Sequence, residues 1–248
     1  MQAAPTVSVV IPVKDDAVLL RRCLAALAAQ HLRPHEIVVV DNGSTDASAD
    51  VAREYCARVV AEPEPGIPAA SARGFDAAVG EVIARLDADC VPPPDWIERI
   101  RDAFAADPDL DAITGPARFV DGPRALRTTL SVLYLGSYVA AVTPALGHVP
   151  LFGSNLAVRR SAWLAVRDEV HRHDLLMHDD MDLSMHLGPR RRFRYDLGLG
   201  MGMSMRALRG DEVLRFRRGV HSIVAHWPAQ FPARRWWRRA VWRSNRAA

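Results

Sequence analysis

The chain has 248 residues, of which 49% are hydrophobic and 25% are charged, so it can bury a sizeable globular core. It contains no internal repeat and no low-complexity linker. The formal net charge of +3 conceals an asymmetry. Residues 1–120 hold 11 Lys and Arg against 19 Asp and Glu, whereas residues 121–248 hold 21 against 10. The basic half is suited to an anionic partner such as a phosphate, a phospholipid surface or nucleic acid.

The three cysteines, Cys23, Cys56 and Cys90, are odd in number and widely spaced. They indicate neither a disulfide framework nor a metal motif, and they are typical of a reducing compartment. The N-terminal residues lack the basic and apolar regions of a signal peptide. The longest apolar stretch, residues 130–146, is interrupted by polar residues and a proline, so we expect a buried or interfacial helix rather than a membrane span. These features predict a cytoplasmic protein.

The first half of the chain alternates between predicted strands and predicted helices. β-Branched runs predict four strands, at residues 7–12, 36–40, 58–60 and 82–86. Apolar residues at helical spacing predict three helices, at residues 19–30, about 45–55 and about 69–79. Ser44 or Thr45 is expected to cap the second helix. This alternation with short links predicts an α/β fold whose sheet is doubly wound and mostly parallel, with helices on both faces.

Beyond residue 94 the elements are expected to be shorter and more varied. Helices are predicted at residues 96–104, 126–141 and 179–187, with a short helix capped by Ser161. Strands are predicted at residues 111–114, 118–120, 153–158 and 197–205. No domain boundary is apparent. We therefore expect a single domain over residues 1–248, with an acidic half to about residue 120 and a basic half beyond it.

Two carboxylates follow the buried run at residues 82–86, namely Asp87 and Asp89, and prolines 92–94 prevent the strand from continuing. Open α/β sheets bind ligands beyond the carboxyl ends of their strands. Two carboxylate oxygens there are suited to Mg²⁺ or Mn²⁺, which bind carboxylates together with substrate phosphates. An isolated Asp-x-Asp pair can instead cap the next helix, and at this point that alternative stays open.

Six ordered motifs between about residues 7 and 187 resemble those of the family 2 glycosyltransferases, enzymes of the GT-A fold that use nucleotide-sugars. The motifs are V-V-I-P-V-K-D-D, V-V-V-D-N-G-S-T-D, G-I-P-A-A-S-A-R-G, L-D-A-D, G-S-N-L-A-V-R-R and H-D-D-M-D-L. The chain departs from the usual family pattern at Lys14, Asp15, Asp16, Asn42 and Gly74. These departures leave the identity of the nucleobase and the sugar open.

The resemblance implies a donor site in the first half of the chain. Asp41 would accept a hydrogen bond from the nucleobase, and Arg73 would pair with the diphosphate or the base. Pro12 and Asp16 would shape the pocket for base and ribose, and Gly66 belongs to the loop of the third motif. The donor is expected to be a UDP-, GDP- or dTDP-linked sugar.

The resemblance also implies a divalent metal ion, Mg²⁺ or Mn²⁺. Asp89 would bind this ion directly, and Asp87 would hold the ribose or a metal-bound water. A downstream histidine completes the metal shell in some relatives, and His221 is the preferred candidate here, with His226 as the alternative. The metal would stabilise the charge that develops on the leaving nucleoside diphosphate.

On the acceptor side, the stretch from His178 to Leu183 contains three carboxylates. By its position in the motif, Asp180 is the expected base of an inverting transfer. Asp179, Gly153 and Asn155 are expected beside the acceptor. Acidic residues also favour a helix N-terminus through the helix dipole, which is the alternative interpretation of this stretch.

The implied reaction is inverting, metal-dependent transfer of a sugar to a hydroxyl of a small molecule, a glycan or a lipid-linked acceptor, with no nucleic-acid partner. The alternatives are a sugar-1-phosphate nucleotidyltransferase and an inactive nucleotide-sugar-binding protein of the same fold. The C-terminal segment, residues 231–248, mixes arginines with tryptophans and is suited to contact the inner membrane face. Its alternative is a solvated tail whose tryptophans pack on the domain.

Overall fold

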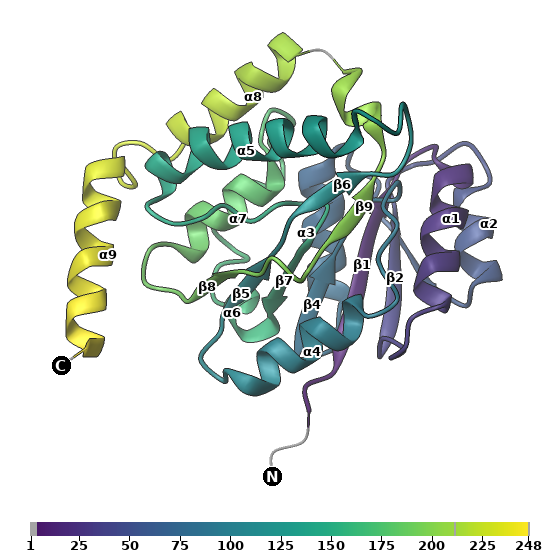
Figure 1. Cartoon of the computed structure of the whole chain (residues 1–248), viewed down its shortest axis with the longest axis horizontal. Coiled ribbons are helices and arrows are strands. Elements are labelled where there is room, and N and C mark those ends of the chain that lie inside the picture. The colour runs from purple at the N-terminus through teal and green to yellow at the C-terminus, as the bar shows by residue number, and fades with distance from the viewer. Residues whose placement is uncertain (1–3, 211, 248) are drawn as a thin grey trace.

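The computed structural model describes residues 4–210 and 212–247, which surround a seven-stranded sheet with the strand order β3-β2-β1-β4-β7-β5-β8 (Figure 1). The strands of this sheet are β1 (Val7–Val13), β2 (Glu36–Asp41), β3 (Arg58–Ala61), β4 (Val82–Arg85), β5 (Ala112–Thr114), β7 (Leu156–Arg159) and β8 (Phe193–Tyr195). Strand β7 is antiparallel to β4 and β5, and the other pairs in the sheet are parallel. A mostly parallel α/β sheet is therefore confirmed.

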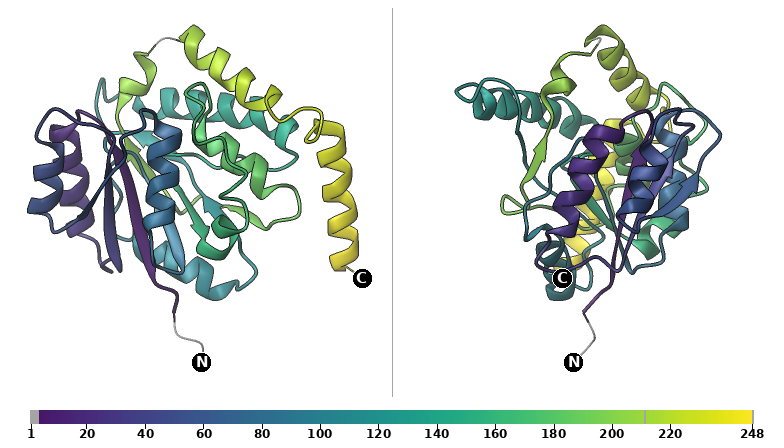
Figure 2. Two further views of the ribbon diagram at one scale, coloured as in Figure 1. Left: turned by 180° about the vertical axis from the view of Figure 1, so that it is seen from behind. Right: turned by 90° about the vertical axis from the view of Figure 1, so that its right-hand side faces the viewer.

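Helices cover both faces of this sheet (Figure 2). They are α1 (Ala17–Ala28), α2 (Ser48–Glu54), α3 (Ile67–Ala77), α4 (Trp96–Ala106), α5 (Arg127–Leu146), α6 (Arg160–Leu164), α7 (Asp179–Leu187), α8 (Glu212–Val224) and α9 (Pro232–Ala247), with a 3-10 turn η1 (Met205–Leu208). A second sheet of two parallel strands, β6 (Ala117–Phe119) and β9 (Met201–Met203), lies beneath α5.

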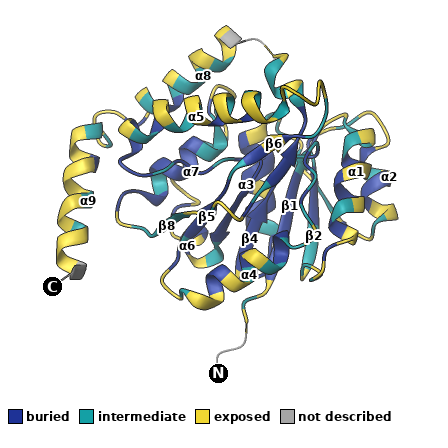
Figure 3. Ribbon diagram, in the orientation of Figure 1, coloured by how far each residue is buried: buried dark blue, intermediate teal, exposed yellow. Residues whose placement is uncertain are grey.

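The alternation of side chains along β1 explains how one strand contributes to two cores. Val9 and Ile11 belong to the core that includes α1, α2 and α4, whereas Val10 belongs to the core that includes α3, α6 and α7. Both large tryptophans of these layers, Trp96 and Trp163, are buried, as their apolar surroundings require. The inner strands β1, β4, β5 and β7 are accordingly the most continuously buried part of the molecule, whereas the edge strands β3 and β8 contain no buried residue (Figure 3).

Three helices, α5, α8 and α9, form an outer layer that is far more exposed (Figure 3). By length and composition α5 could cross a membrane, and 28% of its apolar window is buried. This low burial does not favour the buried helix that was one of the two expected alternatives. Helix α8 runs along α5, and α9 stands at the end of the molecule opposite α1 and α2 (Figures 1 and 2). No helix was predicted beyond residue 205, so α8 and α9 were missed, whereas α5 was predicted at residues 126–141.

The predicted cap of the second helix is wrong. Helix α2 begins at Ser48, whose backbone N–H donates to the Asp46 carboxylate at 2.9 Å. Ser44 and Thr45 instead bind Asp15, which draws the two loops after β1 and β2 together. A local capping pattern was thus overridden by a contact between residues distant in sequence.

The single strand predicted at residues 197–205 is also wrong over most of its length. Strand β9 spans only Met201–Met203, and a turn in which Leu199 N–H donates to Asp196 O precedes it. Leu197 is exposed, whereas Leu199, Met201 and Met203 are buried in one core, so the alternation marked a buried face only beyond residue 198. The edge strand β8, with its Arg194 and flanking charges, lacked an apolar pattern that could predict it.

Candidate active site

The antiparallel strand β7 brings two distant segments together. Because β7 runs against β4, its first residue, Leu156, lies opposite Arg85 at the end of β4. The turn before β7, residues 153–155, therefore adjoins the segment after β4, which carries Asp87 and Asp89. A parallel strand in this place would have put that turn at the other edge of the sheet.

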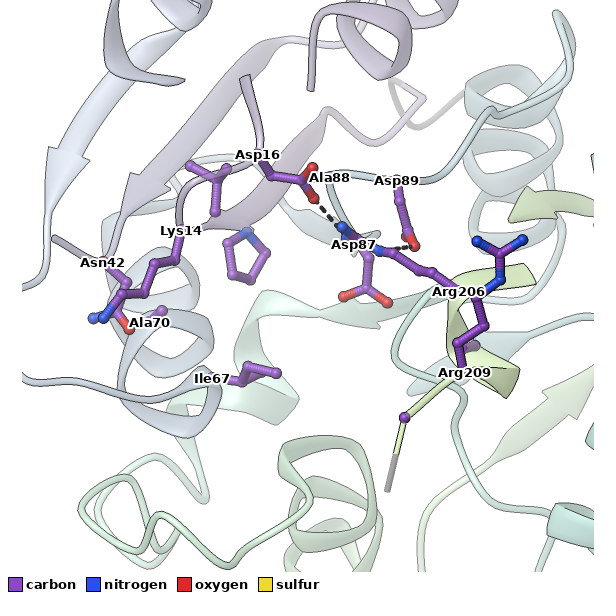
Figure 4. Close-up of a pocket in the computed structure, with 14 residues that line it drawn as sticks. Lys14, Asp16, Asn42, Ile67, Ala70, Asp87, Ala88, Asp89, Arg206 and Arg209 are labelled. Atoms are coloured by element: carbon purple, nitrogen blue, oxygen red, sulfur yellow. Dashed lines mark hydrogen bonds and ion pairs between the residues drawn. The ribbon is translucent and has the colours of Figure 1, made fainter. Parts of the chain in front are cut away.

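A cavity of about 570 Å³ opens at this edge (Figure 4). Pro12, Asp16, Asp87 and Asp89 line it, and so four of the predicted donor-site residues are brought together. Arg206 also lines the cavity, and it comes from η1 near the C-terminal end of the chain. A strand, two loops and the η1 turn thus contribute to one pocket.

Arg206 holds the carboxylates of this cavity in place. Its guanidinium lies 2.5 Å from the Asp16 carboxylate and 2.6 Å from that of Asp89 (Figure 4). Burial raises the pKa of Asp89 to about 6, and the nearby Asp87 adds to this rise, while Arg206 opposes it. Arg206 could not be predicted from a local pattern, because its ion pairs with Asp16 and Asp89 join residues more than one hundred positions apart.

The donor set around Asp89 fits a hard divalent cation. Single ligand atoms of Asp87, Asp89 and Cys90 lie within 4.8 Å of one another. Burial, with the charges of Asp87 and Asp89, raises the pKa of the Cys90 thiol well above its usual range, so this group stays protonated and is a poor ligand. Two carboxylates remain, and these suit Mg²⁺ or Mn²⁺.

Arg85 connects the donor carboxylates to the acidic helix start. It is 3% exposed, although it ends a strand, and its Nη2 atom lies 2.9 Å from Asp87 Oδ1 and 3.3 Å from Asp179 Oδ2. The pKa of Arg85 is raised because the attraction of Asp179, Asp87 and Asp180 outweighs the effect of burial. Arg85 was not predicted as a site residue, because it lies within the apolar run at residues 82–86. A charged residue in a buried strand just before Asp-x-Asp was the available signal.

The turn before β7 binds both acidic groups. Gly153 N–H donates to Asp180 Oδ2 at 2.9 Å, and the Ser154 hydroxyl donates to Asp87 Oδ2 at 2.5 Å. A Cβ atom at Gly153 would lie 2.1 Å from Arg85 Nη1, so a larger residue would displace the guanidinium. Two neighbouring residues therefore fix the positions of Asp87 and Asp180 relative to each other.

Asp180 lines a second, mostly apolar cavity of about 400 Å³ between α5, α7 and α8. Tyr134, Tyr138, Phe216 and Val220 are among its other lining residues. Burial raises the pKa of Asp180, and the charge of Asp179 raises it further. A carboxylate with a raised pKa in an apolar cavity is a candidate general base.

Three of the predicted donor residues lie apart from the lining of the larger cavity. Asp41 accepts a hydrogen bond from Ser44 N–H, and Arg73 is exposed on α3. Gly66 has a φ of 122° and donates its N–H to Asn42 Oδ1 at 2.8 Å. Asn42 was predicted only as a departure from the family pattern. Of the two hydrogen-bonded residues Gly66 and Asn42, it is Asn42 that lines the cavity.

Asn155 and the two candidate histidines are engaged in contacts of their own, outside the ligand group of Asp87 and Asp89. Asn155 is buried and donates to Leu199 O at 2.6 Å while accepting from Trp96 Nε1, so it braces the core. His221 pairs with Asp174 at 2.6 Å, and His226 belongs to a separate histidine cluster. Neither is part of the described ligand group of Asp87 and Asp89. The structure thus does not bring the expected histidine to the metal site.

Comparison with known proteins agrees with this geometry. Residues 8–163 match the family model described as glycosyl transferase family 2, and this segment includes the Asp87–Asp89 pair and the 153–155 turn. The chain belongs to this family. The match runs through six of the seven strands of the main sheet, from β1 to β7, and does not favour the nucleotidyltransferase alternative.

Two curated relatives share the family. The chain is 31% identical over 166 residues to the glycosyltransferase EpsH of Bacillus subtilis, which covers 63% of this chain and 48% of EpsH. It is 40% identical over 105 residues to the undecaprenyl-phosphate 4-deoxy-4-formamido-L-arabinose transferase of Pectobacterium carotovorum, which covers 38% of this chain and 32% of the relative. The chain thus spans a third to a half of the length of these relatives.

A solved structure shares the fold across most of the chain. Glucosyl-3-phosphoglycerate synthase of Mycobacterium tuberculosis, in complex with Mn²⁺, UDP and glucosyl-3-phosphoglycerate, superposes with a TM-score of 0.62. The likeness covers 89% of this chain and 79% of the synthase at 21% sequence identity. The GT-A type of fold predicted from the motifs is confirmed.

Proposed function

We propose that this family member is a metal-dependent, inverting glycosyltransferase that moves a sugar from a nucleoside-diphosphate sugar to an acceptor hydroxyl. The main support for this proposal is that a single turn binds one carboxylate in each of the two cavities. Gly153 and Ser154 hold Asp180 in the apolar cavity and Asp87 in the polar one. A transferase needs such an arrangement, because the acceptor and the donor must meet at the anomeric carbon in a fixed orientation.

The larger cavity is the proposed donor site. Asp87 and Asp89 would hold Mg²⁺ or Mn²⁺, and such an ion stabilises the negative charge of the leaving diphosphate. Arg206 occupies a position between Asp16 and Asp89, and its guanidinium is suited to bind a phosphate once the donor is present. The synthase with the same fold holds Mn²⁺ and UDP, which supports this assignment of the cavity.

Asp180 is the proposed general base. It lies where an acceptor in the second cavity would expose its hydroxyl, and its raised pKa improves its ability to take a proton near neutral pH. The N–H of Gly153 orients one of its oxygens. Arg85, which contacts Asp87 and Asp179, would keep the acidic helix start from moving away from the donor.

The acceptor is proposed to carry a lipid. The second cavity is lined mostly by apolar and aromatic side chains, and Phe216 and Val220 of α8 extend it to the surface. One curated relative is an undecaprenyl-phosphate transferase, which supports this class of acceptor. Such a substrate would hold the protein at the cytoplasmic face of a membrane, and the amphipathic α8 and α9 are suited to that surface.

The proposal is tested by an assay of UDP-, GDP- and dTDP-linked sugars with Mn²⁺ and a polyprenyl-linked saccharide, whose sugar hydroxyls can accept the transferred sugar. Asp180→Asn is expected to lower kcat about 10²–10⁴-fold, the usual contribution of a general base, while donor binding stays unchanged. Asp89→Asn should remove the stimulation by Mn²⁺. The anomeric configuration of the product, determined by NMR, should be opposite to that of the donor.

Asp168→Asn is the matched control, because Asp168 is an exposed aspartate remote from both cavities. Full activity of Asp180→Asn would remove Asp180 from the mechanism. Retention of the donor's configuration would exclude an inverting transfer.

A further inference from the structure

Three histidines and an aspartate converge at a place separate from the two cavities. His171 precedes α7, Asp182 and His186 lie on α7, and His226 follows the end of α8. One ligand atom from each of the four side chains lies within 4.8 Å of every other. Asp182 and His186 are four residues apart on one helix, so their side chains share a face.

The spacing of these atoms is close to that of ligands around one small ion, and the two shortest distances are also those of hydrogen bonds. Asp182 Oδ1 lies 2.8 Å from His171 Nδ1, 3.2 Å from His186 Nε2 and 3.0 Å from His226 Nε2. His186 Nε2 lies 3.3 Å from His226 Nε2 and 3.4 Å from His171 Nδ1. Around tetrahedral zinc, bond lengths of about 2.0–2.2 Å place neighbouring ligand atoms about 3.3 Å apart or slightly more.

The outer contacts of two rings leave the converging nitrogens without protons. His226 Nδ1 lies 2.7 Å from the Ser222 carbonyl, which only accepts, so in the neutral ring Nε2 carries a lone pair. His186 Nδ1 likewise faces the Glu169 carboxylate at 3.4 Å. The lone pairs of two Nε2 atoms and one carboxylate oxygen then point at one another, which is unfavourable unless a cation lies between them. Hydrogen bonds from the opposite ring nitrogen to a carbonyl or carboxylate are the usual outer contacts of metal-bound histidines.

Protonation of all three rings is a poor alternative to a metal ion. Asp182 Oδ1 has two lone pairs and could not accept three donors equally, and Asp182 Oδ2 already accepts the backbone N–H of His171 at 2.7 Å. The side chains of His186 and His226 are 8% and 2% exposed, so several positive charges would be buried around one carboxylate.

We propose that His171, Asp182, His186 and His226 form a closed structural site for a divalent transition-metal ion, with Zn²⁺ as the expected occupant. Imidazole nitrogens suit Zn²⁺ better than Mg²⁺ or Mn²⁺, and four protein ligands without an open position are typical of structural zinc. This site differs in chemistry from Asp87 and Asp89, whose two carboxylates suit a harder ion.

The ion would join α7 to the end of α8. Helix α7 carries Asp180 at its start, and α8 supplies Arg215, Phe216 and Val220 to the second cavity. Bound zinc would therefore fix one wall of that cavity relative to the carboxylate inside it. This inference does not depend on the identity of the acceptor or on catalysis.

The first test measures metal content in the full chain, prepared without a histidine tag. After incubation with Zn²⁺ and desalting, elemental analysis should find about one zinc per chain. Substitution by Co²⁺ should give the strong visible absorption of a tetrahedral complex. The Asp87→Asn/Asp89→Asn double variant should retain this zinc, because these residues are outside the cluster.

The second test compares two histidines near the C-terminal end of α8. His226→Gln should weaken Zn²⁺ binding at least about 100-fold, since loss of a ligand exceeds the 10–100-fold loss typical of an outer-shell partner. His221→Gln is the matched control, because His221 lies in α8 but pairs with Asp174. His171→Gln, at the most exposed ligand, provides a second variant in case His226→Gln does not fold.

Competition with a chromophoric chelator gives the affinities in both tests. Zinc binding by His226→Gln and His171→Gln at the wild-type affinity would overturn the proposal. Loss of zinc from the Asp87→Asn/Asp89→Asn variant would assign the ion to the carboxylate pair instead.

Discussion

At the scale of single residues, Arg85 links the carboxylate of the donor cavity to the acidic start of α7. Its guanidinium is buried between Asp87 and Asp179, and it lies against Gly153, where a Cβ atom would collide with it. Each of these carboxylates would lose its charge partner without Arg85. Arg85 thus both stabilises the fold through its ion pairs and keeps the two cavities aligned.

We expect Arg85→Met to lower the free energy of unfolding by about 3 kcal/mol, because it leaves two partly buried carboxylates, Asp87 and Asp179, without their charge partner. Chemical denaturation measures this change. Arg99→Met removes an exposed pair with Asp95 and should cost about 0–1 kcal/mol. Equal effects of the two substitutions would mean that Arg85 does not hold the carboxylates together.

Asp89 gives the metal site a dependence on pH. Its pKa is raised to about 6, so in the metal-free protein the proton is held more tightly than in the unfolded chain. The corresponding stabilisation is complete below about pH 4 and is lost as the pH rises through 6. Because Mn²⁺ requires the ionised carboxylate, its affinity should fall up to about tenfold for each pH unit below 6.

Titration calorimetry with Mn²⁺ at pH 5, 6 and 7.5 measures this dependence. The affinity should change little above pH 7, and in Asp89→Asn it should be low at each pH. Equal Mn²⁺ affinities at pH 5 and 7.5 in the wild-type protein would contradict the assignment of Asp89 as a ligand.

At the scale of elements, α9 shows how a basic tail becomes part of the fold. Arg235 is completely buried and donates to the carbonyl oxygens of Leu146 at 2.7 Å and Met185 at 3.0 Å. Burial, together with Arg238 and Arg239, lowers the pKa of Arg235 to about 10. The next residues, Trp236 and Trp237, remain exposed. The helix therefore both packs on the domain and presents aromatic side chains to solvent.

Arg235→Met is expected to lower the free energy of unfolding by about 2–3 kcal/mol, because buried carbonyl groups lose their donors. Arg238→Met is the control, since Arg238 lies in the same helix and is exposed. Thermal unfolding of the two variants provides the comparison. A loss of stability in Arg238→Met as large as in Arg235→Met would show that charge, rather than the buried contacts, anchors α9.

At the scale of the whole molecule, apolar side chains are exposed on the helices farthest from α1 and α2. Phe216 on α8 is 73% exposed and Trp237 on α9 is 68% exposed, and the surrounding sequence is rich in arginine. Aromatic and basic residues together favour the surface of an anionic membrane. We propose that this side of the molecule faces the membrane that holds the lipid acceptor.

Sedimentation with anionic liposomes tests this orientation. Phe216→Ser/Trp237→Ser should weaken binding at least about tenfold, since burying an aromatic side chain contributes about 1.5–3 kcal/mol. Val18→Ser is the control, because Val18 is an exposed apolar residue on α1 at the opposite end. Unchanged sedimentation of the double variant would exclude this surface. Deletion of residues 231–248 would be a poor test, because it removes the buried Arg235.

The sequence by itself determined the family, the mostly parallel sheet and the Asp87–Asp89 pair. These features depend on local patterns: β-branched runs that form buried strands, and carboxylates placed directly after one of them. Pro12, Asp16 and Asp180 were found in the same way, as members of short motifs.

Only the tertiary structure decided which charges meet. Arg206 and Asp89 are 117 positions apart in the sequence, and His226 and Asp182 are 44 apart. No spacing pattern in the sequence predicts either contact. The antiparallel direction of β7, which places Gly153 beside Arg85, is likewise a property of the assembled sheet. Pairings of this kind depend on the closure of long loops around a common core, and local propensity does not encode them.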